Sequence, residues 1–208
     1  LRDADSALHA IDLKPTLKEK KEQLKVLKDL QGEVRAKELE IDAVTEKAQQ
    51  LNKTLVTGRS SVVTELGHSY HQVSFKVKEL YGRWKQYVNS HLEFENLMRE
   101  TNDWLEGIAS KLEYCSDLSA SNQTDLEGKL TTIQNLLLYR DEGFSKVQNA
   151  VELAQQVLAN TAPDGHDEIN QSLAALQKQW SSLASKMIEV KVRHQDLHEQ
   201  LQQAITSS

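Results

Sequence analysis

The sequence predicts an all-α protein that consists of two consecutive three-helix bundles sharing a continuous helix. The first observation is an internal repeat, in which three helical patterns return in the same order. Leu1 returns as Leu105, Leu24 as Leu130 and Trp84 as Trp180, so that the offsets are 104, 106 and 96 residues. The second observation is that apolar residues recur at alternating steps of three and four. The third is that the chain has only two prolines, and both fall where the repeat requires a loop.

The first unit begins with residues 1–10, which we expect to be the end of a helix that starts before Leu1. The chain is therefore expected to be part of a longer protein. Pro15 fits the first turn of a second helix over residues 16–55, where its missing N–H costs little. Residues 57–61 break that helix, and Gly58 can adopt the left-handed conformation that caps a helix end. The apolar stripe of this helix consists of Leu24, Leu27, Leu30, Val34, Ile41, Val44, Ala48, Leu51 and Leu55.

The third helix is expected to continue into the second unit. Its stripe runs from Leu66 to Leu112, and no loop signal interrupts the chain between Gln72 and Tyr114. This predicts a shared rod of about 50 residues, which is about 75 Å at 1.5 Å per residue. The predicted domains are residues 1–93, with a truncated first helix, and residues 94–208, a complete repeat.

The second unit has three further predicted elements. Residues 116–123 form a loop whose polar side chains can cap the next helix. A helix over residues 124–160 follows, and a turn at 161–165 contains Pro163. The last helix is expected over residues 167–205. The two units therefore differ in loop lengths but share one order of helices.

Composition excludes several classes of function. The net charge of −6 disfavours broad binding of nucleic acid through phosphate neutralisation. No apolar segment is long enough to cross a bilayer, and no N-terminal secretion signal is present. The single cysteine, Cys115, cannot form an internal disulfide. These features predict a cytoplasmic protein without direct membrane insertion.

No residue pattern indicates an enzyme, a cofactor or a metal centre. The carboxylates are scattered along helix faces, and no nucleophile or phosphate-loop motif occurs. Two histidine pairs, His68 with His71 and His194 with His198, have metal-ligand spacing but no strong third ligand nearby. We expect them to be solvated or packed. The three tryptophans, which are expected to be core anchors rather than a ligand-binding aromatic box, are Trp84, Trp104 and Trp180.

The second helix of the first unit is electrically bipolar. Residues 14–28 hold six lysines and two glutamates, a net charge of +4, whereas residues 29–46 hold six acidic and two basic residues, a net charge of −4. One interpretation is a solvated face with intramolecular ion pairs. The other is a basic patch that docks an acidic partner or anionic lipid, with Lys18, Lys21 and Lys25 as candidate contacts.

The first unit also carries an insertion. Gln50 and Trp84 are 34 residues apart, but their counterparts Gln156 and Trp180 are 24 apart, so ten extra residues precede the third helix. These residues fall within 55–72. The helices could simply extend and pack on each other, or the extra element could be a recognition surface whose apolar side chains need a partner. Its candidate contacts are Val62, Val63, Leu66, Tyr70 and His71.

These features together resemble spectrin repeats. The resemblance rests on Trp104-Leu105 at the start of a first helix, on the matched Trp84 and Trp180, on the pitch near 106 and on the fused helix. It covers the whole chain and implies left-handed three-helix bundles. The polar helix surfaces and the insertion are more similar to nesprin-type nuclear-envelope scaffolds, or to plakins and dystrophin, than to spectrin itself.

The resemblance implies a spacer and protein-docking rod that links the nucleus or a membrane to the actin and microtubule cytoskeleton. A cytoskeletal or actin-regulatory partner would dock on the first repeat or the junction, and neighbouring repeats of the parent chain would adjoin the rod. A distant anchor would place it at the outer nuclear membrane. The alternatives are a purely mechanical spacer of a spectrin, plakin or dystrophin-like protein, and a membrane-bending dimer of BAR type. The repeat and the net charge speak against the BAR type.

Overall fold

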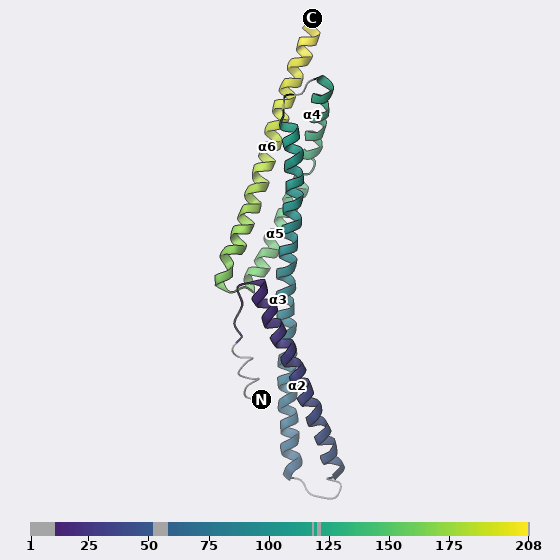
Figure 1. Cartoon of the computed structure of the whole chain (residues 1–208), viewed down its shortest axis with the longest axis vertical. Coiled ribbons are helices and arrows are strands. Elements are labelled where there is room, and N and C mark those ends of the chain that lie inside the picture. Colours follow the sequence, from purple (N-terminus) through teal and green to yellow (C-terminus); the bar gives the residue numbers. More distant parts are fainter. Residues whose placement is uncertain (1–10, 52–57, 118, 120–121, 208) are drawn as a thin grey trace. The chain divides into compact units, whose positions relative to one another are not determined.

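The computed structural model describes residues 11–51, 58–117, 119 and 122–207, and within this part every element is a helix (Figure 1). This confirms the predicted all-α class. The expected helix end at residues 1–10 lies outside the described residues. The elements are α2 (Leu17–Leu51), α3 (Gly58–Ser116), α4 (Gln123–Leu137), α5 (Arg140–Ala159), the 3₁₀ turn η1 (Pro163–Gly165) and α6 (His166–Ser207).

The chain divides into two compact units. Unit 1 comprises Leu1–Leu92 and Ala159–His166, and unit 2 comprises Glu93–Leu158 and Asp167–Ser208. Helix α3 is 59 residues long and contributes to both units without a break. The segment Ala159–His166 belongs to unit 1, although the predicted second domain includes it. The description of the units as left-handed spectrin repeats stays a prediction.

The core of unit 1 lies between α2 and α3. Two residues of α2 seven positions apart, Leu27 and Val34, are buried against Val73, Val77 and Trp84 of α3. Heptad spacing produces this arrangement because positions seven apart return to nearly the same side of a helix. The partly buried residues around this core are Ile11, Leu24, Leu30, Tyr70, Leu80, Tyr81 and Tyr87.

The core of unit 2 is larger and draws on α3, α4, α5 and α6. Trp180 is buried, and Trp104 packs beside it as a partly buried residue, with 6.0 Å between the ring centroids. The Nζ atom of Lys146 lies 5.5 Å from the centre of the Trp104 ring. Other buried residues of this core include Leu105, Ile108, Leu112, Ile133, Leu136, Ala150, Ala154, Val157, Leu176 and Met187.

The prediction of one helix over residues 124–160 is wrong, because a two-residue turn at Leu138 and Tyr139 separates α4 from α5. The Leu138 N–H donates to the carbonyl of Asn135, and the Tyr139 N–H donates to that of Leu136. These bonds span three residues and tighten the last turn of α4. Four apolar residues follow one another from Leu136 to Tyr139, and a helix cannot bury all of them on one side. The turn leaves Leu138 and Tyr139 exposed.

The expected cap at Gly58 is also wrong, since Gly58 is the first residue of α3 and residues 58–61 are helical rather than a loop. Residues 52–57 lie outside the described residues. The polar cap before the next helix is confirmed: the Asn122 side chain accepts a hydrogen bond of 2.8 Å from the Asp125 N–H. This bond satisfies one of the free donors at the start of α4.

Candidate functional site

A stripe of exposed lysines follows the first two turns of α2. Lys18, Lys21 and Lys25 are all exposed, and their spacing of three and four places them on one helix face. The buried residues Leu27 and Val34 lie on the opposite face. Within the described part of the chain, none of the three lysines forms an ion pair with a carboxylate. Three exposed positive charges therefore lie side by side on one face of α2.

Lys20 does not belong to this stripe, although it lies within the same basic segment. It is completely buried, and its Nζ donates to Asn160 Oδ1 at 2.6 Å and to Thr161 Oγ1 at 2.9 Å. Burial lowers the pKa of Lys20 to about 8, because a charged ammonium loses hydration there. Lys20 is thus a structural residue that joins the start of α2 to the segment Ala159–His166.

Close backbone packing holds the segment Ala159–His166 of unit 1 in place. The Ala162 N–H donates to the Lys14 carbonyl at 3.0 Å. A Cβ atom at Gly165 would lie 2.0 Å from the carbonyl oxygen of Pro15, so only glycine fits this approach. His166 Nε2 lies 2.8 Å from the Thr161 carbonyl oxygen. The position of Lys20 follows from these contacts.

His91 of α3 is a second buried ionisable group of unit 1. Burial, and to a smaller extent the positive charge of Lys20, lower the pKa of His91 to about 4. An imidazole in such surroundings stays neutral at pH 7. His91 therefore adds no positive charge to the lysine stripe at neutral pH.

Residues 58–72 of the predicted recognition element form the start of α3, and residues 55–57 lie outside the described residues. Val62 is 64% exposed and Leu66 is 42% exposed, whereas Tyr70 packs against the unit 1 core. The side chain of Val63 lies outside the described residues. The two exposed apolar residues lie one helical turn apart, so they share a face. Their role in recognition stays a prediction.

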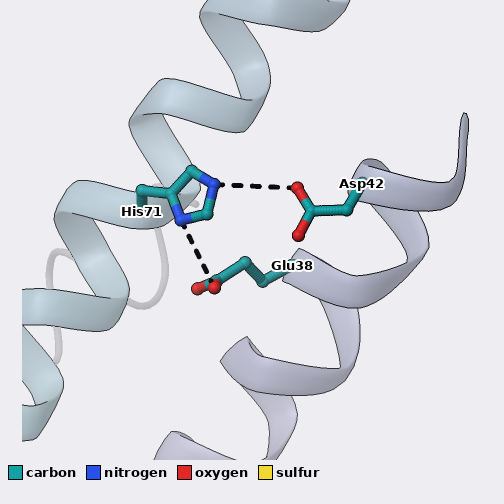
Figure 2. Close-up of side chains that lie close together, drawn as sticks. All are labelled: Glu38, Asp42 and His71. Atoms are coloured by element: carbon teal, nitrogen blue, oxygen red, sulfur yellow. Dashed lines mark ion pairs between the residues drawn. The ribbon is translucent and has the colours of Figure 1, made fainter. Parts of the chain in front are cut away.

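Three polar side chains of unit 1 converge where α2 and α3 lie side by side (Figure 2). The His71 ring lies between two carboxylates, with Nδ1 3.3 Å from Glu38 Oε1 and Nε2 3.6 Å from Asp42 Oδ1. Glu38 is 5% exposed, and its Oε1 also accepts a hydrogen bond of 2.7 Å from Arg35. The buried Glu38 Oε2 has no hydrogen-bond partner in the described structure. We refer to Glu38, Asp42 and His71 as the polar cluster.

Sequence reasoning missed the polar cluster, although two signals were present. Glu38 occupies an inward position four residues after the buried Val34, and Asp42 follows one turn later. His71 comes from a different helix, and its register against α2 depends on tertiary packing. In the described part of the chain, the polar cluster is the one group of three side chains with metal-ligating atoms within 4.8 Å of one another.

The structure separates the members of the two histidine pairs. His68 is exposed and its Nε2 lies 3.2 Å from Gln72 Nε2, whereas His71 joins the polar cluster. In unit 2, the buried His194 hydrogen bonds to the Cys115 carbonyl, and His198 lies 3.7 Å from Glu127. Burial also raises the pKa of the Cys115 thiol, so this cysteine stays protonated and unreactive.

The tryptophans lie in the two cores. Trp84 is 2% exposed and packs edge-on against Tyr87, with 5.3 Å between the ring centroids. A residue that sequence reasoning overlooked is Gly143 of α5, which is buried directly against Trp180. The sequence feature that could have pointed to it is a glycine at an inward heptad position, four residues before Val147.

None of the described helices combines the length and apolarity needed to cross a lipid bilayer. The described residues form helical bundles with buried apolar cores, an exposed basic stripe and one polar cluster. This architecture is compatible with a structural scaffold that is not an enzyme.

A similarity to a known protein supports this class. The chain is 51% identical over 191 residues to the Muscle-specific protein 300 kDa of Drosophila melanogaster. The match covers 92% of this chain and 2% of the length of that relative. No protein-family model matches the chain. The similarity to a muscle protein and the all-helical fold support a general scaffold role.

Proposed function

We propose that the chain is a segment of a cytoskeletal linker of the nesprin type, in which spectrin-like repeats form a spacer and a docking rod. Several features support this proposal: the internal repeat, the uninterrupted α3 and the strong similarity to a muscle protein. The rod would couple the nucleus or a membrane to actin and microtubules, and a distant anchor would place it at the outer nuclear membrane. Neighbouring repeats of the parent protein would continue the rod at its ends.

The observation that carries the docking role is the lysine stripe of α2. Lys18, Lys21 and Lys25 are exposed on one helix face, and none of them forms an ion pair within the described residues. Their positive face would attract an acidic cytoskeletal or actin-regulatory protein and increase the rate of association. A pure mechanical spacer would bind no such partner.

We expect the triple exchange Lys18→Glu, Lys21→Glu and Lys25→Glu to weaken partner binding by about tenfold or more, which corresponds to about 1.4 kcal/mol. The loss should shrink at high salt, because salt screens exposed charges. The measurement is co-sedimentation with actin filaments and with microtubules, and capture from muscle lysate by the wild-type and variant chains, at low and high ionic strength.

A matched control is the triple exchange Lys111→Glu, Lys178→Glu and Lys186→Glu, which changes exposed lysines of unit 2. Both variants lower the net charge by the same amount, so a difference between them reports position rather than total charge. Equal binding by the wild type and both variants would contradict docking on α2. Failure of the wild type to bind any filament or enrich any protein would favour the mechanical spacer.

The start of α3 offers a second, apolar part of the proposed docking surface. We expect Val62→Glu with Leu66→Glu to reduce partner capture while leaving the helicity and unfolding free energy nearly unchanged, because both side chains are exposed. Circular dichroism and the same capture experiment check this result. A loss of stability with unchanged capture would show instead that the extension serves packing within the rod.

A further inference from the structure

The polar cluster lies in the heptad seam of unit 1, where a charged residue is unfavourable. Val34 and Glu38 are both buried on α2, one turn apart. Removing a carboxylate from water is costly unless every oxygen finds a partner. Arg35 and His71 both contact Oε1 of Glu38, whereas the buried Oε2 has no hydrogen-bond partner. This oxygen lacks the compensation that a core carboxylate requires.

The three side chains have the chemistry of a transition-metal site. Zinc binds imidazole nitrogen and carboxylate oxygen at about 2.0–2.2 Å, so neighbouring ligand atoms around a tetrahedral ion lie about 3.3 Å apart. One ligand atom from each of the three residues lies within 4.8 Å of the others, which is somewhat wider than this spacing, and the two His71 nitrogens lie 3.3 Å from Glu38 Oε1 and 3.6 Å from Asp42 Oδ1. The presence of an imidazole favours zinc over magnesium and calcium, which prefer oxygen alone.

Metal binding needs a local rearrangement that the cluster permits. The His71 ring presents a different nitrogen to each carboxylate, and a single ion would take only one of them (Figure 2). The side chains of His71 and Asp42 are 54% and 51% exposed, so both can turn toward a shared ion. Arg35 opposes the ion because its guanidinium contacts Glu38, but its side chain is 62% exposed and can move into solvent.

The charge of the surrounding segment favours a cation. Residues 29–46 carry a net charge of −4, which attracts positive ions to this part of α2. Glu40 pairs with Lys37 at 3.4 Å, so it is not a competing ligand in the cluster. The cluster therefore combines a buried oxygen without a hydrogen bond, two accessible ligands and a negative local field.

We propose that Glu38, Asp42 and His71 bind one Zn²⁺ ion that clasps α2 to α3 in unit 1. Glu38 supplies the buried oxygen, His71 supplies one ring nitrogen, and Asp42 supplies the third ligand at the exposed side. Water completes the coordination, as in zinc sites with three protein ligands. The ion would stabilise unit 1, because it binds the folded arrangement and not the separated helices.

The test is a calorimetric titration of the metal-free 208-residue chain with Zn²⁺ at neutral pH. We expect one ion per chain. The Zn²⁺ affinity should be lower than that of the wild type by about tenfold or more in each of Glu38→Gln, Asp42→Asn and His71→Ala. The matched controls, His68→Ala and Glu40→Gln, change a neighbouring histidine and a neighbouring carboxylate and should bind as the wild type does. Circular dichroism verifies that each variant keeps its helices.

A second measurement needs no variant of the cluster. Zinc binding should shift the imidazole ¹⁵N resonances of His71 in the wild-type chain and leave those of His68, His194 and His198 in place. No binding at millimolar Zn²⁺ would overturn the proposal. So would shifts at the other histidines alone, undiminished affinity in His71→Ala, or affinity lost in His68→Ala, which would indicate a chance surface site.

Discussion

Replacing Gly143 by alanine is expected to lower the free energy of unfolding of unit 2 by about 1–3 kcal/mol, the range for overpacked cores. An added Cβ would lie 2.1 Å from Cη2, 2.4 Å from Cζ3 and 2.5 Å from Cζ2 of Trp180. The indole cannot withdraw easily, because it is 8% exposed and lies against Trp104. Urea unfolding followed by circular dichroism measures the change.

The matched control is Gly128→Ala in α4, where an added Cβ meets no atom within 4 Å. Alanine is favoured over glycine inside a helix by about 1 kcal/mol, so this variant should gain stability. The same chemical exchange therefore has opposite signs at two helical positions of one unit. If both variants gain stability, Gly143 of α5 does not lie as close to Trp180 of α6 as the structure places it.

A double-mutant cycle with Trp180→Phe identifies the cause. Phenylalanine lacks the indole atoms that meet the added Cβ, so Gly143→Ala should cost much less in the Trp180→Phe background. The difference between the two backgrounds is the coupling energy of the pair. An equal cost in both backgrounds would assign the effect to the turn at Leu138 and Tyr139 rather than to the indole.

Most of the helical architecture was predictable because periodic apolar stripes are local signals. The stripe of α3 continues past residue 92, the last residue of α3 that belongs to unit 1, and no glycine or proline interrupts it there. The same kind of signal located α6 to within two residues at each end. Helix formation over such lengths requires only that one face be apolar throughout.

The break between α4 and α5 was not predictable from the same signals. Leu138 and Tyr139 are apolar residues without any turn preference, and neither glycine nor proline marks the site. The run of four apolar residues from Leu136 to Tyr139 does not say where a helix would end, and the backbone hydrogen bonds that span three residues at the end of α4 show the position of the turn. Tertiary packing overrides local preference at this point.

The candidate sites were predictable only in part. The exposed lysines follow from helical spacing, but the burial of Lys20 depends on Asn160 and Thr161, which are 140 and 141 residues away in sequence. His71 likewise meets Glu38 and Asp42 through the register of two helices. Such contacts lie beyond any local pattern, so a sequence can show the residues without showing which of them meet.

The second large effect is expected in the acid stability of unit 1. The pKa of His91 falls from 6.5 to about 4 in the folded chain, mainly through burial and further through the charge of Lys20. Between these pH values the unfolded chain binds a proton that the folded chain does not bind. The free energy of unfolding therefore falls as the pH decreases from 6.5 to 4. Above that window His91 contributes no pH dependence to it.

The size of this loss follows from the shift. Each pKa unit corresponds to 1.36 kcal/mol, so His91 should account for about 3 kcal/mol between pH 6.5 and pH 4. His91→Gln removes the titrating group, and the difference between the wild type and this variant isolates its contribution because all other groups are shared. Urea unfolding at half-unit pH steps gives the two curves.

The exposed His68 on the same helix provides the control. The pH dependence of His91→Gln should be flatter than that of the wild type by about 1.4 kcal/mol per pH unit at the middle of the window, and His68→Gln checks whether loss of a histidine from α3 changes the curve by itself. Parallel curves for the wild type and His91→Gln would show that His91 is hydrated in the folded chain, either because water enters the core or because its side chain turns into solvent. In that case the buried pair of Lys20 and His91 could not make unit 1 acid-sensitive.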